Sequence, residues 1–146
     1  METKKIIISV TSDLSTDHRV QKTTQTLYEA GFDVLLIGRK TRKSLPFQAK
    51  YPFRQFRLLF NSSFLFYAEY NVRLFFLLLF TKADIFLAND LDTLLANCLA
   101  GKIKKKRIVY DTHELFTEVP ELNGRNFVKC VWKKIEKYCI PMVNKS

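Results

Sequence analysis

One of the two histidines in this chain, His113, lies between carboxylates in the segment DTHE. Asp111 comes two residues before it and Glu114 directly after it, and the apolar run 107–110 leads into all three. A polar cluster at the end of a buried strand is either a turn with its caps or part of a working site. Imidazole nitrogens and carboxylate oxygens are also metal ligands, so these residues are candidates for substrate or metal binding.

The other histidine lies in a second polar cluster, SDLSTDHRV, which follows the β-branched run 6–10. Asp17 has the position of a helix N-cap, and the Arg19 side chain can bind a phosphate or a carboxylate through two parallel hydrogen bonds. Alternatively, Asp13 and Asp17 cap the helix and Arg19 pairs with them. His18 stands between these groups. Asp13, Asp17, His18 and Arg19 are therefore candidate substrate-binding residues.

The loop after the first apolar run contains no glycine, which excludes two common phosphate-binding motifs. Neither the GxGxxG turn of NAD-dependent dehydrogenases nor the GxxxxGK[ST] loop of P-loop NTPases is present. Metal chemistry has little support either, because His18 and His113, with Asp90 or Asp111 as a further ligand, have no HxxxH or HExxH spacing. We therefore expect no metal site and no cofactor.

The three cysteines are scattered and form no CxxC pair. Each falls on a helical pattern beside apolar neighbours, which predicts buried free thiols in a reducing cytoplasm rather than disulfides or zinc ligands. A cysteine nucleophile is not expected on such packed helical faces. The three are Cys98, Cys130 and Cys139.

Apolar runs and amphipathic segments alternate along the chain. The runs predict strands over 6–10, 33–37, 84–88 and 107–110, with a less regular one near 56–60. Apolar residues at helical spacing predict helices over 17–30, 64–80, 91–100 and 126–138. Gly31 and Gly101 are expected to end the first and third of these helices. The residues expected to face the core from the last helix are Val128, Val131, Ile135 and Tyr138.

Strands that alternate with helices predict an α/β fold. We expect a Rossmann-like parallel sheet with helices on both faces, in a single domain over residues 1–146. In such a sheet ligands bind at the carboxyl ends of the strands. Both histidine clusters follow predicted strands, and so do Asn89 and Asp90, which come after the run 84–88. The three clusters are therefore expected at one edge of the sheet, as its ligand-binding residues.

The composition is basic and rich in apolar residues. Twenty-four lysines and arginines stand against 14 aspartates and glutamates, a formal net charge of +10. This balance favours an anionic partner, namely nucleic acid, a phosphorylated ligand or an acidic membrane surface, or it reflects a solvated basic face. A hydrophobic content of 47% excludes intrinsic disorder. No secretory signal is expected, and the segment 64–80 has an unbroken apolar part too short to span a bilayer.

Three ordered motifs carry a family resemblance: SDLSTDHRVQKTTQTLYEAGFDVLLIGR, ADIFLANDLDTLLANCLA and KRIVYDTHELFTEVPEL. Over residues 4–132 the chain resembles the N-terminal domain of retaining family 4 glycosyltransferases of the GT-B fold, in particular bacterial members that build surface polysaccharides. The motif support is least over 39–80. The loop SDLSTD departs from the glycine-rich turn of many relatives, so Arg19 would replace contacts made there through bare backbone.

The resemblance implies one half of a two-domain hexosyltransferase, the N-terminal half of a GT-B fold. The C-terminal domain of such enzymes holds most contacts to the nucleotide-sugar donor, whereas the N-terminal domain binds the acceptor. His113 matches the histidine that reaches the donor sugar near the reacting carbon, where its N–H would hold a sugar hydroxyl in the transition state. No paired-glutamate motif precedes Ser146. We therefore expect a truncated domain, without its donor-binding partner, that transfers no sugar by itself.

Two kinds of partner besides the donor follow. The family resemblance implies a glycan or lipid-linked acceptor and a cytoplasmic location, at the inner face of the cytoplasmic membrane. The basic residues Arg39, Lys40, Arg42, Lys43 and Lys50 come before the apolar segment 64–80 and would contact anionic lipid peripherally. The apolar residues of that segment are too many for one buried stripe, so exposed Phe or Leu side chains would insert as well; alternatively the segment is simply buried. A different interpretation is a basic α/β nucleic-acid-binding module, supported by the charge and the tract 102–107. The concentration of aromatics in one apolar helix argues against it.

Overall fold

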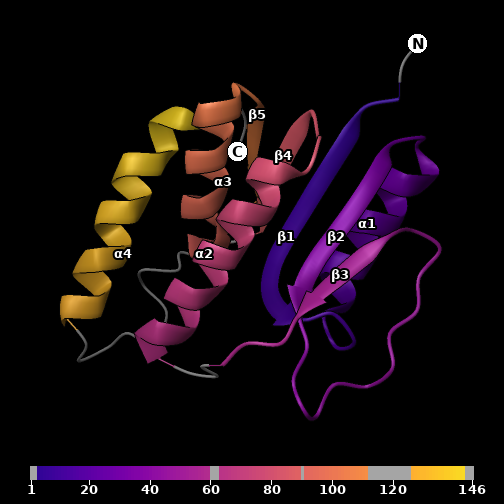
Figure 1. Cartoon of the computed structure of the whole chain (residues 1–146), viewed down its shortest axis with the longest axis horizontal. Coiled ribbons are helices and arrows are strands. Elements are labelled where there is room, and N and C mark those ends of the chain that lie inside the picture. The colour runs from indigo at the N-terminus through magenta and orange to yellow at the C-terminus, as the bar shows by residue number, and fades with distance from the viewer. Residues whose placement is uncertain (1–2, 60–62, 90, 112–125, 144–146) are drawn as a thin grey trace.

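The computed structural model describes residues 3–59, 63–89, 91–111 and 126–143. It contains one five-stranded parallel sheet in the order β3-β2-β1-β4-β5 (Figure 1). The strands are β1 (Lys5–Asp13), β2 (Asp33–Arg39), β3 (Phe53–Phe56), β4 (Ile85–Asn89) and β5 (Arg107–Asp111). Strand β1 is central, with β2 and then β3 on one side of it and β4 and then β5 on the other. The predicted Rossmann-like α/β fold is confirmed.

Helices cover both faces of the sheet. They are α1 (His18–Glu29), α2 (Ser63–Phe80), α3 (Leu91–Lys104) and α4 (Asn126–Cys139), and a short 3₁₀ turn (Ile140–Met142) follows. Helix α1 packs on one face, α2 and α3 pack on the other, and α4 lies beside α3 (Figure 1).

The alternation of side chains along β1 explains why both faces need cover. Ile7 points toward α2, where it shares a cluster with Leu74 and Leu78, while Ile6 and Ile8 point toward α1. All of these side chains are buried. Because successive residues of a strand face opposite sides, an unbroken apolar run such as this one requires a layer on each face. Each fully buried side chain of this kind contributes about 1.5–3 kcal/mol of hydrophobic stabilisation.

The connection from β2 to β3 has no helix. Residues 40–52 form no regular secondary structure, and they lie on the α1 side of the sheet. Phe47 and Tyr51 belong to the apolar cluster under α1, and the Phe47 ring meets the Phe53 ring edge-on with centroids 4.7 Å apart. These aromatic side chains take the place of a second covering helix on this face.

Four local predictions were wrong. The strand expected near 56–60 lies at Phe53–Phe56. Helix α3 does not stop at Gly101 but runs to Lys104 and ends where Lys105 adopts a φ of 56°. A Cβ on Gly101 would lie 2.7 Å from the Ile108 side chain, so the glycine permits close packing on β5. On α4 the exposed side chains include Tyr138, expected to be buried, and the thiol of Cys130.

Candidate functional site

The carboxyl edge of the sheet brings the described members of the three clusters to neighbouring strands. Strand β4 lies between β1 and β5, and Asn89 pairs in register with Asp111. His18 and Arg19 begin α1 directly after the β1 turn. Asp90, His113 and Glu114 lie outside the described residues. The sheet therefore gathers Asp13, Asn89 and Asp111 at one edge, as expected for strands that all run the same way.

In the turn after β1, both aspartates accept hydrogen bonds from their neighbours. Asp17 is the N-cap of α1: one carboxylate oxygen accepts the backbone N–H of Val20 at 3.1 Å, and the other accepts the Ser12 hydroxyl. Capping of this kind satisfies a backbone donor that the helix itself cannot. Asp17 therefore caps the helix, as in the alternative interpretation of this cluster.

Asp13 ties the turn to the β2–β3 connection. Its carboxylate accepts hydrogen bonds from the Ser15 backbone at 2.9 Å, the Ser15 hydroxyl at 2.7 Å and the Ser44 hydroxyl at 2.5 Å. Burial opposes ionisation of this carboxyl, but the hydrogen bonds from Ser44 and Ser15 and the nearby Arg39 charge outweigh burial, so the pKa of Asp13 is lowered. The carboxylate stays charged and fixes the turn.

His18 and Arg19 follow Asp17 at the start of α1. Both side chains are exposed, in the first turn of α1. A helix N-terminus carries a partial positive charge that favours anions, and a guanidinium adds a planar donor to it. His18 also lines an open groove of about 410 Å³ between α1 and the β2–β3 connection, together with Gln21, Gln25 and Phe47. This side of the turn is therefore open to a ligand.

The turn after β4 is built from buried polar side chains. Asn89 donates from Nδ2 to the Ser9 carbonyl at 3.5 Å and accepts the Thr93 hydroxyl through its backbone carbonyl at 3.1 Å. Asp92, also buried, accepts the Thr11 hydroxyl at 2.5 Å. These bonds join β1, β4 and α3 below the edge of the sheet, so Asn89 acts mainly as internal support.

Sequence reasoning missed two further members of this support. Asn97 is fully buried and donates from Nδ2 to the Ser9 hydroxyl at 2.9 Å and to the Thr93 carbonyl at 2.8 Å. The Tyr70 hydroxyl donates to the Val10 carbonyl, and burial raises the pKa of this phenol well above its ordinary value. A single polar residue inside an apolar helical face, such as Asn97 in LLANCLA, was the signal available.

Arg39 was assigned to a basic loop by sequence, but it ends β2 and belongs to this edge. Its guanidinium lies 4.5 Å from the centre of the Phe66 ring. Cation–π contacts of this length are favourable and orient the side chain. The Arg39 guanidinium, oriented by the Phe66 ring, thus lies at the carboxyl edge near Asp13.

Within the described part of the chain, no three histidine, cysteine or acidic side chains lie close enough together to hold a metal ion. In the same residues, no helix is both long enough and apolar enough to cross a bilayer.

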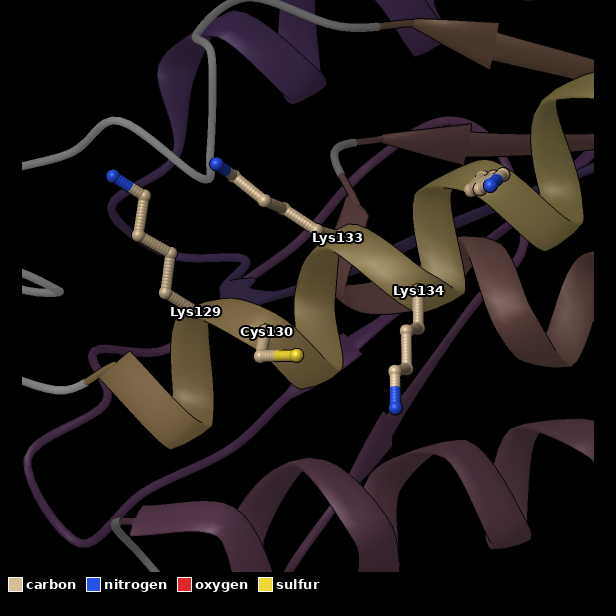
Figure 2. A pocket seen from close by; sticks show the side chains of 5 residues that line it. Lys129, Cys130, Lys133 and Lys134 are labelled. Atoms are coloured by element: carbon tan, nitrogen blue, oxygen red, sulfur yellow. The ribbon is translucent and has the colours of Figure 1, made fainter.

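Two lysine-rich grooves are lined by residues outside these polar clusters. One, of about 440 Å³, runs along the outer face of α4, where Lys129 and Lys133 point to one side and Lys134 to the other, with the Cys130 thiol between them (Figure 2). The second, of about 400 Å³, lies at the opposite, amino edge of the sheet and is lined by Lys5, Lys82, Asp84, Lys104 and Lys106. In the amino-edge groove, Lys104 donates to the carbonyls of Leu78 and Thr81 at the end of α2.

The fold defines a class: a parallel α/β domain whose carboxyl edge holds the polar clusters. Solved structures share this fold. A UDP-N-acetylglucosamine 2-epimerase superposes with a TM-score of 0.56 and 19% sequence identity over 86% of this chain. A protein from Listeria monocytogenes assigned to the same activity gives 0.50 and 14% over 90%. The chain spans 39% and 37% of the lengths of these two proteins. No protein-family model and no curated protein matches the chain.

Proposed function

We propose that this chain is one domain of an enzyme that acts on nucleotide sugars. The observation that carries the proposal is the open side of the β1 turn, where His18 and Arg19 begin α1 at the ligand-binding edge of the sheet. The likeness of the fold to proteins named as UDP-N-acetylglucosamine 2-epimerases supports the same substrate class.

The finer proposal is a hexosyltransferase of the GT-B type, with this chain on the acceptor side. The motifs quoted above, SDLSTDHRV and DTHE among them, support it. In this scheme Arg19 and the α1 N-terminus bind a phosphate or carboxylate of the bound substrates, and the acceptor is a glycan or a lipid-linked glycan. A second domain would hold most of the nucleotide.

An NMR titration of the chain with UDP-N-acetylglucosamine and, separately, with a neutral oligosaccharide tests the coarser proposal. Amide shifts are expected around Ser12, Arg19 and Thr93, at the carboxyl edge. The lysine groove at the amino edge is the built-in control, because it is basic but lies at the opposite edge of the sheet from the proposed site. Shifts confined to that groove, or no shifts at millimolar ligand, would contradict the proposal.

The role of His113 is tested in an enzyme that joins this domain to a donor-binding domain. His113→Ala is expected to lower turnover about 100-fold or more if the imidazole holds the sugar in the transition state. The chain alone is expected to transfer no sugar. Wild-type rates in the variant would reduce His113 to a turn residue, and turnover by the chain alone would overturn the division into two domains.

A further inference from the structure

Helix α2 exposes a row of large apolar side chains. Val72, Phe76 and Phe80 follow one another at a spacing of four residues, and their exposed fractions are 57%, 51% and 80%. The opposite face of the helix is buried, through Tyr70, Leu74 and Leu78. A helix that needed only to cover the sheet would carry polar residues on its outer face. A contiguous apolar row in contact with water indicates a surface that binds something.

The row borders a groove between α2 and the edge strand β3. The groove has a volume of about 610 Å³, and Phe56, Leu77 and the three exposed side chains supply its apolar lining. The rings of Phe76 and Phe80 are nearly parallel, at 10°, with centroids 6.5 Å apart. The charged residues of the groove are both arginines, Arg54 on β3 and Arg73 on α2. We call these seven residues, with Thr81, the α2–β3 groove: Arg54, Phe56, Val72, Arg73, Phe76, Leu77, Phe80 and Thr81.

The charges of this groove favour an anionic occupant. Arg73 is partly compensated, because its Nε lies 2.9 Å from the Glu69 carboxylate. Arg54 is exposed, and no carboxylate in the described part of the chain forms an ion pair with it. A second copy of the chain would bring like charges together, on a protein that already carries +10. An occupant that is apolar and anionic at once satisfies both the phenylalanines and the arginines.

We propose that the α2–β3 groove is a membrane-contact surface that binds the interface of an anionic lipid bilayer. Phe76 and Phe80 enter the boundary between head groups and acyl chains, and Arg54 pairs with lipid phosphate, so that α2 lies in the plane of the interface. The proposal is independent of the proposed function, since it requires neither a nucleotide sugar nor an acceptor.

This surface uses the apolar segment 64–80 that the sequence suggested, but not the basic loop that precedes it. Arg39 is held against the Phe66 ring, and Ser44 in the same loop is bonded to Asp13. The β2–β3 connection packs on the α1 face of the sheet, whereas α2 packs on the other. The apolar side chains that a bilayer would receive are therefore on the α2 side.

Co-sedimentation with vesicles tests the proposal. The chain is expected to bind vesicles of phosphatidylcholine with phosphatidylglycerol, and to bind pure phosphatidylcholine much more weakly. Binding should weaken in about 1 M salt, where the screening length falls to about 3 Å. Phe76→Ser with Phe80→Ser is expected to lower partitioning at least tenfold, because two apolar insertions are lost. Arg54→Gln is expected to lower it about fivefold.

Matched variants separate this surface from general stickiness and general charge. Ile103→Ser removes an apolar side chain that is 61% exposed on α3, outside the groove, and Lys134→Gln removes a charge on α4. Each should change partitioning by less than about twofold, as expected for surface changes elsewhere. Circular dichroism checks that all variants are folded.

Three results would overturn the proposal. One is no binding to anionic vesicles at low salt. Another is an equal loss of binding in the groove variants and their matched controls. The third is a wild-type dimer, measured by light scattering, that does not bind vesicles and that Phe76→Ser with Phe80→Ser converts to a monomer. The groove would then be an interface between copies of the chain.

Discussion

The two strand-to-helix turns after β1 and β4 lie side by side at the carboxyl edge, yet they use their polar residues differently. After β1, Asp13 and Asp17 bind hydroxyl and backbone donors of their own turn and of the adjacent loop, close to the surface. After β4, Asn89 and Asp92 are buried and bond to residues of β1, about 80 positions away. One turn is a local surface structure and the other is a long-range buried one.

This difference assigns separate tasks to the two turns. Removal of a buried acceptor leaves its donor without a hydrogen-bond partner and away from water, which lowers the free energy of unfolding. At the surface, water can replace a lost partner. The β4 turn is therefore expected to determine stability, while the β1 turn can present side chains to a ligand with little effect on stability. Four predictions test this division.

The largest effect is expected at the buried turn. Asp92→Ala leaves the Thr11 hydroxyl without its acceptor and is expected to lower the free energy of unfolding by about 2–3 kcal/mol. Urea denaturation measures this loss. Thr11→Val and the double variant complete a cycle that isolates the pair. A loss below about 0.5 kcal/mol would mean that this turn is no more important to stability than an ordinary surface site.

Arg19→Ala is expected to show the opposite pattern, with a loss of binding and little loss of stability. Affinity for UDP-N-acetylglucosamine should fall about tenfold, as for one charge-assisted hydrogen bond lost. The free energy of unfolding should change by less than about 0.5 kcal/mol, because the side chain is exposed. Lys102→Ala, also exposed but on α3, is the control. The same loss of affinity in both variants would point to net charge rather than to a site.

Asp17 has an intermediate role, because it serves the turn through a helix cap. Asp17→Ala is expected to lower the free energy of unfolding by about 1 kcal/mol, since the Val20 backbone N–H loses its acceptor. Asp17→Asn should restore most of this loss, because asparagine caps about as well as aspartate. Thermal denaturation of the three proteins measures the difference. A failure of asparagine to rescue would assign the effect to the charge instead of the cap.

The smallest effect is expected at Asp13, and it depends on pH. Since the pKa of this carboxyl is lowered from 3.8, ionisation stabilises the folded chain above about pH 4, and the contribution is lost as the pH falls through the folded-state pKa. Because the carboxyl is close to solvent, a few tenths of a kcal/mol is expected. Unfolding measured from pH 3 to pH 6 should show Asp13→Asn converging on the wild type at the acid end. A constant difference would contradict this.

The sequence predicted most of the fold because its strands are short apolar runs and its helices begin and end at recognisable residues. The run at 6–10 marks β1, Asp17 was identified as a cap, and Gly31 has the positive φ, 100°, expected after a helix. Gly101 misled the prediction, because a glycine that ends a helix and a glycine that permits close packing look the same in a sequence. Only the position of Ile108 distinguishes them.

The carboxyl edge was only partly predictable. The rule for parallel sheets placed the polar clusters at one edge, but it could not show which side chains are buried. Thr11 and Asp92 are 81 residues apart, and Tyr70 lies in an apolar helix, so nothing local indicates that they support the same edge. The apolar residues of the segment 64–80 are too many for one buried stripe, which indicated that some would be exposed, but a helix that is apolar all round does not show which residues form its outer face.

The central position of β1 has a consequence for synthesis on the ribosome. Of the five strands described, β1 is made before the others, and β2 can join one of its edges soon afterwards, but the other edge waits for β4, which begins at Ile85. At about 5–20 residues per second, the emerging chain carries an unpaired β-branched strand edge for roughly 4 to 14 s. Such an edge can pair with other nascent chains. The abundance of folded protein in the cell should therefore depend on translation speed between residues 13 and 85 and on chaperones that cover that edge.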